Sequence, residues 1–236
     1  MPTSDAQAHG DDVRRMFDRI APRYDLLNTL MTFGRDRAWR RETIRRLKLR
    51  SDERLLDLGT GTGDLALEAR RRAPRARVVA ADFALGMIRR GRRRPGAKAV
   101  NWLIADALHL PFAAGTFHAL TSGFLLRNVA DLDRALAEQF RMLRSGGRLA
   151  CLDTTPPPAG RLRPLLDFHL SRVIPLLGRL IAGDPEAYNY LPRSTVGFLT
   201  ADALARRLTL AGFRGVGFAG RMFGTIAIHW GEREQY

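Results

Sequence analysis

Two spacings of hydrophobic residues alternate along most of the chain. Short apolar runs bounded by polar residues, which are typical of buried strands, occupy residues 54–58, 78–82, 102–106, 117–124 and 148–153. Between these runs, hydrophobic residues recur at the spacing of amphipathic helices over residues 65–73, 87–94 and 131–143. Strands that alternate with helices in this way predict an α/β fold, in which helices cover both faces of a parallel sheet.

The chain before the first strand predicts helices. Hydrophobic residues recur at helical spacing over residues 13–50, which we interpret as an N-terminal helical cap that Pro22 interrupts. Residues 1–12 are polar and acidic, so we expect them to form a disordered tail. This tail lacks the basic start and the apolar run of a signal peptide, so we expect a cytoplasmic protein.

The chain after the fifth predicted strand departs from the alternating pattern. Pro156–Pro158 cannot belong to a central strand, and the apolar segment behind them predicts an inserted helical lid over residues 154–196. A last helix and two closing strands are predicted at residues 200–212, 213–218 and 222–230. Together these elements predict one domain, residues 13–236, built on a doubly wound, mostly parallel, seven-stranded sheet.

The most informative segment is a glycine-rich loop between the first strand and the next helix, Leu56-Asp57-Leu58-Gly59-Thr60-Gly61-Thr62-Gly63-Asp64. Glycines let such a loop turn sharply and let a ligand approach the backbone closely. The loop differs from the dinucleotide fingerprint, because Gly63 follows Gly61 by two residues and not by three. Asp57 and Asp64 bracket the loop and would repel a pyrophosphate, so a cationic ligand such as S-adenosylmethionine fits better.

Two further acidic residues follow the second and third predicted strands. Asp82 ends the second strand, where an acid accepts hydrogen bonds from ribose hydroxyl groups. Asp106 and Ala107 follow the third strand, where they would meet the adenine edge of the same ligand. Because ligands of open α/β sheets bind beyond the carboxyl ends of the strands, the loop and both acids should form one site. The alternative is that Asp82 and Asp106 only cap helices.

Composition and charge add little to this interpretation. The chain has 236 residues and a net charge of +15, and only Lys48 and Lys98 among its 39 basic residues are lysine. A positive surface attracts nucleic acid or anionic lipid, although a preference for arginine codons would produce the same charge. The single cysteine, Cys151, excludes an internal disulfide and a cysteine-rich zinc site. No apolar run is long enough to predict a membrane span.

Several longer motifs resemble those of a known family. They are Met16–Asn28, Phe33-Gly34, Trp39-Arg40, Leu126–Val129, Tyr188–Ser194 and Ala227–Gly231. With the glycine loop, they are similar to the quinone-ring C-methyltransferases that make menaquinone and ubiquinone, a family of class I S-adenosylmethionine-dependent methyltransferases. The resemblance implies a Rossmann-like fold, S-adenosylmethionine as the methyl donor, no metal and a prenylated quinol as the acceptor.

The resemblance also implies roles for individual residues. The residues that would bind the donor are Tyr24, Asp57, Gly59, Gly61, Thr62, Gly63, Asp82, Asp106, Ala107, Ser122 and Gly123. Arg127 would stabilise an oxyanion, Asn128 would orient a hydroxyl group or a water molecule, and Tyr24 would cover the donor. The less specific interpretations are a turn with an exposed arginine for Arg127-Asn128 and a core side chain for Tyr24.

More than one acceptor agrees with these motifs. Demethylmenaquinol is the leading hypothesis, and the prenylated methoxybenzoquinol of ubiquinone synthesis is the alternative. The family's usual residues are replaced at Asp153–Pro157 and at Phe223-Gly224, which leaves open a diverged methyltransferase for another lipophilic molecule. A hypothesis from another class is a basic binding protein that has lost catalysis, although no motif for methylation of nucleic-acid bases is present.

Partners beyond the acceptor are predicted from the lid and from the resemblance. The lid contains many apolar residues with arginines among them. One hypothesis is that it lies on the inner face of the cell membrane as a peripheral contact. The alternative is that it packs on the rest of the domain. We also expect a homodimer and no specific nucleic-acid partner. A lone histidine is more often structural, so we expect His118 to lie at the surface or pack on a helix, and His169 and His229 to pack. Contact with the substrate is the alternative for His169, and Cys151 is expected to be a small core residue.

Overall fold

The computed structural model describes residues 4–173, 175–176, 190 and 194–234 of the chain. At its centre lies a seven-stranded sheet with the order β3-β2-β1-β4-β5-β7-β6. The strands are β1 (Arg54–Leu58), β2 (Arg77–Asp82), β3 (Asn101–Ile104), β4 (Phe117–Gly123), β5 (Leu143–Thr154), β6 (Arg214–Arg221) and β7 (Ile226–Glu232). The first five strands are parallel, and β7 pairs antiparallel with both β5 and β6. This topology confirms the predicted fold class.

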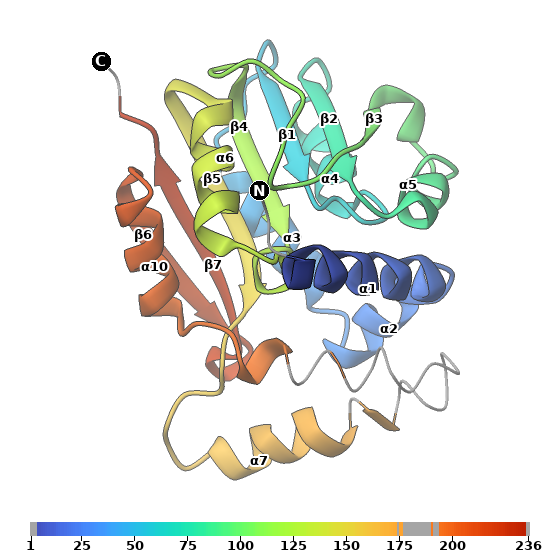
Figure 1. Cartoon of the computed structure of the whole chain (residues 1–236), viewed down its shortest axis with the longest axis vertical. Helices are drawn as coiled ribbons and strands as arrows, with labels where there is room; N and C mark the ends of the chain where they lie inside the picture. Colours follow the sequence, from blue (N-terminus) through green and yellow to red (C-terminus); the bar gives the residue numbers. More distant parts are fainter. Residues whose placement is uncertain (1–3, 174, 177–189, 191–193, 235–236) are drawn as a thin grey trace.

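The helices form layers around this sheet (Figure 1). They are α1 (Ser4–Ile20), α2 (Tyr24–Met31), α3 (Asp36–Arg46), α4 (Asp64–Arg72), α5 (Leu85–Gly91), α6 (Leu132–Met142), α7 (Arg163–Phe168) and α10 (Ala201–Leu210). The short helical turns are η1 (Ala97–Ala99), η2 (Leu126–Asn128), η4 (Met222–Gly224) and the π-helical turn η3 (His169–Val173). The Asp131 carboxylate accepts from the Arg134 backbone N–H and so caps α6.

Two buried clusters hold helices against the sheet. One cluster contains Ile44 of α3 and Leu65 of α4, packed on residues of β1, β2, β4 and β5. The other contains Leu136 of α6 and Leu208 of α10, packed on the same strands. Residues of both helices in each pair are almost fully buried. The runs that predict strands are therefore apolar almost throughout, because both of their faces are covered.

The N-terminal region differs from its prediction. Helix α1 starts at Ser4, so residues 4–12, which we expected to form a disordered tail, lie in the same helix as the predicted cap. No proline interrupts the chain between Thr3 and Ala21, and burial of Met16 and Ile20 holds the C-terminal half of the helix. The preceding turns then continue the helix at little further cost. The helix ends before Pro22, as the sequence predicts.

The predicted lid is described only in part. Helix α7 and turn η3 cover residues 163–173, and Figure 1 shows them on the side where α1 and α2 lie. Residues 174, 177–189 and 191–193 of the predicted lid lie outside the described residues, so most of the motif Tyr188–Ser194 does too. The boundaries of the predicted lid and domain therefore stay predictions.

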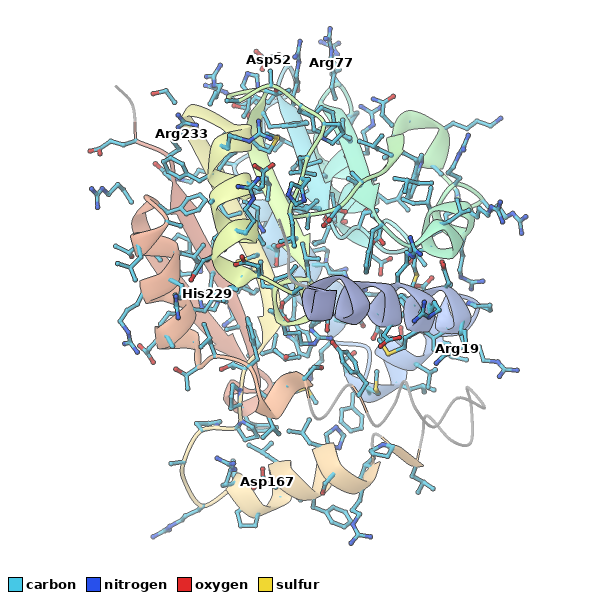
Figure 2. All side chains as sticks on the ribbon, in the orientation of Figure 1. Arg19, Asp52, Arg77, Asp167, His229 and Arg233 are labelled. Atoms are coloured by element: carbon cyan, nitrogen blue, oxygen red, sulfur yellow. The ribbon has the colours of Figure 1, made fainter. Side chains whose placement is uncertain are left out.

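Charged side chains lie at both ends of the sheet. Figure 2 shows Asp52 and Arg77 beside the starts of β1 and β2, and Asp167 on α7 at the opposite side of the molecule. Among the described residues, no group of three or more histidine, cysteine or acidic side chains is arranged to hold a metal ion. None of the described helices is both long enough and apolar enough to cross a membrane.

Candidate functional site

A cavity of about 870 Å³ lies at the carboxyl ends of the parallel strands. Small-molecule sites typically have volumes of about 300–1,000 Å³. Residues that follow β1, β2, β3 and β4 line this cavity, which we call the main cavity. Residues of α1 and Tyr24 at the start of α2 line it as well, and Figure 1 shows α1 crossing in front of these strand ends. The predicted edge of the sheet therefore carries a covered site.

The glycine loop forms the floor of the main cavity through its backbone. Gly59, Gly61 and Gly63 have φ values of 64°, 57° and 90°, in the left-handed region that favours glycine. A Cβ at Gly59 or Gly63 would come within 2.7 Å of Leu125 or 2.4 Å of Trp102. A Cβ at Gly61 would meet only Tyr24, at 3.9 Å. Packing therefore requires glycine at the first and third positions, and open space beside the second leaves room for a ligand.

Asp82 is the buried acid of the main cavity. Its Oδ2 accepts from the Gly61 backbone N–H at 2.7 Å, and its Oδ1 accepts from Ala84 N–H at 2.9 Å. Burial raises the pKa of Asp82 to about 6, although these backbone donors lower it. The carboxylate therefore ties the glycine loop to the end of β2 and, at neutral pH, presents negative charge to the cavity.

Asp57 has a different position from the one predicted. It is fully buried, and its Oδ2 accepts from Thr60 Oγ1 at 2.6 Å and from the Ala66 backbone N–H at 2.9 Å. It does not line the main cavity. Burial is the largest cause that raises the pKa of Asp57 to about 7. Asp57 therefore supports the glycine loop through its hydrogen bonds to Thr60 and Ala66.

Replacing Asp57 with asparagine should flatten the pH dependence of stability. The carboxyl has a higher pKa in the folded chain than its ordinary value of 3.8, so the folded state holds its proton more tightly. This stabilises the folded state at low pH and is lost as the pH rises from about 4 to 7, at up to about 1.4 kcal/mol per pH unit. Between pH 4 and pH 8, the unfolding free energy of the variant should therefore fall by about 2–4 kcal/mol less than that of the wild type.

The matched control for this variant is Asp52→Asn. Asp52 is exposed at the amino end of β1 (Figure 2). Urea unfolding at several pH values measures both variants and the wild type, so that the contribution of other groups cancels in the differences. A wild-type pH profile in Asp57→Asn would show that burial does not keep this carboxyl protonated.

Asp64 forms ion pairs with two arginines. Its Oδ2 lies 2.5 Å from Arg40 Nη1, and its Oδ1 lies 2.6 Å from Arg94 Nη1. Burial raises the pKa of Asp64, but the two guanidinium groups outweigh this effect and lower it. The Thr62 hydroxyl donates to Asp25 Oδ1 at 2.6 Å. Neither Asp57 nor Asp64 lines the main cavity, so a direct contact of either acid with the donor stays a prediction.

The remaining predicted donor-binding residues divide into two groups. Those that line the main cavity are Tyr24, Gly59, Gly61, Asp82, Asp106, Ala107 and Gly123. Those that do not line it are Asp57, Thr62, Gly63 and Ser122. Ser122 is buried in β4 between Leu58 and Cys151, its partners in the neighbouring strands. Asp106 accepts from the Leu108 backbone N–H and keeps more than half of its side chain exposed.

The predicted catalytic residues lie beyond the end of β4. Asn128 lines the main cavity, donates through Nδ2 to the Phe124 carbonyl and accepts from Tyr190 Oη at 3.1 Å. Arg127 lines a second, smaller cavity, and its Nη1 donates to Asp153 Oδ1 at 2.6 Å. Both partners of this ion pair are almost fully buried. Arg127 is therefore not the exposed arginine of a turn, and Asp153 fixes its orientation.

Tyr24 lies where the helical cap meets the glycine loop. Burial raises the pKa of its hydroxyl, so the side chain is protonated at neutral pH and acts as a hydrogen-bond donor. Its ring packs edge-on against Phe17, with the ring centroids 6.0 Å apart. Phe17 and Met87 also line the main cavity, although the sequence reasoning did not select them. The motif Met16–Asn28, which contains Phe17, was a signal that could have found the first of these.

Cys151 and two of the three histidines considered above have the structural roles expected of them. His229 is buried in β7 between the sheet and α10 (Figure 2), and its Nε2 lies 2.9 Å from the Ala201 carbonyl oxygen. His118 lies near the start of β4, far from the main cavity, and accepts from the Arg54 backbone N–H at 3.3 Å. Cys151 is buried in the core. His169 differs, because it stacks on Phe33 and also lines the smaller cavity.

Comparison with known proteins adds a family to this geometry. The profile described as "ubiE/COQ5 methyltransferase family" matches residues 4–233. The chain is 46% identical over 222 residues to a ubiquinone/menaquinone biosynthesis C-methyltransferase of Desulfotalea psychrophila, which covers 94% of this chain and 90% of that protein. It is 47% identical over 220 residues to a demethylmenaquinone methyltransferase of Thermus thermophilus, with 92% and 100% covered.

Solved structures share the fold at much lower identity. A SAM-dependent methyltransferase from Aquifex aeolicus superposes with a TM-score of 0.61 at 16% identity. The match covers 89% of this chain and 97% of that one. At this identity the likeness concerns the fold alone, and it agrees with the seven-stranded sheet described above. The sequence similarity to the two curated relatives carries the more specific information.

Proposed function

Because the chain belongs to the ubiE/COQ5 methyltransferase family, it is a methyltransferase, and we propose that it methylates the ring of a prenylated quinol with S-adenosylmethionine. Demethylmenaquinol is the proposed acceptor, because the names of several similar relatives specify this reaction. The benzoquinol of ubiquinone synthesis is the second candidate, since the Desulfotalea psychrophila relative is named for both pathways. The observation that carries the proposal is the covered main cavity with Asp82 and the glycine loop at the sheet edge.

The residues of the main cavity fit a nucleoside ligand with a positive charge. Asp82 accepts hydrogen bonds and is mostly ionised above its pKa of about 6, and the open space beside Gly61 leaves room for the ligand. Asp106 and Ala107 follow β3, at the position proposed for the adenine edge. S-adenosylmethionine supplies an electrophilic methyl group on a cationic sulfur. Phe17 and Met87 contribute apolar surface that keeps water away from this group.

Residues on the acceptor side have separate roles in the proposal. The guanidinium of Arg127, which cannot act as a base, stabilises negative charge on a ring oxygen. Asn128 is oriented by Phe124 and Tyr190 and positions a hydroxyl group or a water molecule. Tyr24 covers the donor from the cap and donates a hydrogen bond. The ring carbon forms a bond to the methyl group as the sulfur–carbon bond breaks, and water takes the proton that the ring carbon loses.

Product analysis tests the proposed function directly. The full chain is incubated with isotopically labelled S-adenosylmethionine and either prenylated quinol, each kept reduced, and the products are identified by mass spectrometry. Label on the ring carbon of demethylmenaquinol at the higher kcat/KM supports the leading proposal. A preference for the benzoquinol favours the second candidate, and no transfer to either quinol contradicts both. Calorimetry with S-adenosylmethionine and with RNA separates an enzyme from a binding protein, since nonspecific RNA binding disappears in salt.

We also propose that the protein contacts the membrane surface through an exposed apolar patch. The patch consists of large apolar side chains of α2, α7, η4 and the residues beside them, which are Leu26, Leu30, Phe33, Leu162, Leu165, Phe168 and Phe223. Phe33, Phe168 and Phe223 are 74%, 58% and 71% exposed. Arg161 and Arg172 are exposed on the same segment as Phe168 and would meet lipid phosphate. The predicted homodimer stays a prediction.

Removing the aromatic members of the patch should weaken membrane binding. We expect the triple variant Phe33→Ser, Phe168→Ser, Phe223→Ser to bind anionic lipid vesicles about tenfold or more weakly, because less apolar surface leaves water. Vesicle flotation measures the bound fraction. Leu210→Ser is the matched control, since Leu210 is 81% exposed at the end of α10. If the wild type does not float with anionic vesicles, the membrane contact is wrong while the enzymatic proposal stands.

A further inference from the structure

The smaller cavity lies beside the main cavity, and the two share Phe124. Its volume is about 90 Å³. Neighbouring residues divide between the cavities, because Asn128 lines the main cavity and Arg127 lines the smaller one. Most of the smaller cavity's wall is apolar, with Met31, Phe124, Leu166, Leu170, Met222 and Ile226. The smaller cavity is therefore a mainly apolar extension of the main cavity, next to the proposed position of the methyl donor.

Four polar side chains on this wall have atoms that are buried without a hydrogen-bond partner. These atoms are Asn28 Nδ2, Arg127 Nε, Thr154 Oγ1 and His169 Nε2. The Arg127 side chain is only 5% exposed, and its pairing with Asp153 through Nη1 leaves the Nε–H unused. Folded proteins leave few buried polar groups unpaired, so four around one small cavity need an explanation. A ligand with polar atoms at this place would supply their partners.

We infer that the smaller cavity binds the oxygen-bearing edge of the acceptor ring through Arg127, Thr154 and His169. The inference rests on the proposed function and adds the subsite that recognises the acceptor. A quinol ring has apolar faces and hydroxyl groups that both donate and accept hydrogen bonds. The wall matches this chemistry, since Arg127 donates, and the hydroxyl of Thr154 and the imidazole of His169 can donate or accept. A prenyl tail has no polar atom that could satisfy these groups.

The size and position of the smaller cavity agree with this assignment. A cavity of about 150 Å³ admits benzene, so the smaller cavity takes one edge of a ring and not all of it. The rest of the ring would extend past Phe124 into the main cavity, where the methyl donor is proposed to bind. Phe124 is held between the cavities, since its N–H donates to Leu152 O at 2.7 Å and its carbonyl accepts from Asn128.

The backbone of Phe124 supports a functional boundary at this place. Its φ of 59° lies in the left-handed region, which is uncommon for a bulky residue. Conformations of this kind persist where surrounding contacts impose them, and they concentrate at ligand sites. The hydrogen bonds to Leu152 and Asn128 provide those contacts. An acceptor ring would thus meet a rigid edge on one side and the polar atoms of Thr154 and His169 on the other.

The experiment combines two variants with two acceptors. Thr154→Val and His169→Phe are assayed with S-adenosylmethionine and either the prenylated quinol or its analogue that lacks one ring hydroxyl group. For the wild type we expect the analogue's KM to be about fivefold higher or more, which is the effect of one hydrogen bond. In the variant that lacks the partner of that hydroxyl, this ratio should fall to about one. A side chain that only supports the fold would change both KM values equally.

Control variants and separate outcomes keep this test decisive. Thr209→Val and His118→Phe remove the same chemical groups from α10 and β4, outside both cavities, and should keep the wild-type ratio. The dissociation constant of S-adenosylmethionine should be unchanged in all four variants. If the wild type methylates the quinol but both test variants keep its KM ratio, the subsite is wrong and the proposed function stands. If the wild type methylates neither acceptor, the proposed function fails and the subsite with it.

Discussion

Replacing Arg127 with alanine is expected to lower kcat by about 10²–10³, as loss of a single oxyanion-stabilising donor does in other enzymes. The guanidinium lies in a site where it is almost fully buried and where Asp153, 2.6 Å away, holds it in one orientation. Because it lines the smaller cavity and not the main cavity, the dissociation constant of S-adenosylmethionine should hardly change. Steady-state kinetics and calorimetry measure the two effects separately.

A second variant separates this catalytic effect from instability. Alanine at position 127 leaves the Asp153 carboxylate buried without its partner, which costs about 3–5 kcal/mol of stability. Replacing both partners, as in Arg127→Met with Asp153→Leu, removes the unpaired charge and should restore most of the melting temperature. Turnover should stay as low as in the single variant. A stable double variant with wild-type turnover would contradict the role of Arg127 in catalysis.

Replacing Asp82 with alanine is expected to raise the dissociation constant of S-adenosylmethionine by about 100-fold, or roughly 2.7 kcal/mol. Two effects add in this variant. The ligand loses a charged hydrogen-bond acceptor, which is worth about 1.5–3 kcal/mol. The backbone N–H groups of Gly61 and Ala84 also lose their acceptor, so the glycine loop is less well ordered. Calorimetry at pH 7.5 gives the constants for both proteins.

Asp106→Ala is the matched control for the Asp82 variant. Both acids line the main cavity, but Asp106 has more than half of its side chain exposed, so its loss should weaken binding only about threefold. Donor affinity of the wild type should also fall as the pH drops through about 6, where Asp82 gains a proton. Asp82→Asn should lack this step. Equal affinity in the wild type and Asp82→Ala would reduce Asp82 to a purely structural role.

The sheet was predictable because its signals are local. Apolar runs bounded by polar residues are typical of strands that are covered on both faces. The strands β1, β2 and β4 start and end within one residue of their predicted bounds. A proline beyond the first turn of a helix removes a backbone hydrogen bond and breaks the helix, so the break between α1 and α2 at Pro22 was predictable as well. The start of α1 was not, because polar residues continue a helix once its other end is packed.

The candidate site was predictable as a place but not as a set of contacts. The carboxyl ends of parallel strands meet at one edge, so Asp82, Asp106 and Gly61 had to lie near one another. Nothing in the local sequence tells whether an acid faces a ligand, a backbone amide or an arginine from a distant helix. Asp64 pairs with Arg40, which is 24 residues away in α3, and only folding brings the two together.

By itself, the amino-acid sequence determined the order of the elements, the glycine loop and the family, since each depends on neighbouring residues or on motifs. Only the tertiary structure decided which side chains reach the main cavity and which support it from outside, because long-range packing sets their direction. It separated Asp82 from Asp57, and it put Arg127 with Thr154 and His169 around a second, smaller cavity. Groups so far apart along the chain meet only when the lid and the sheet bury them together.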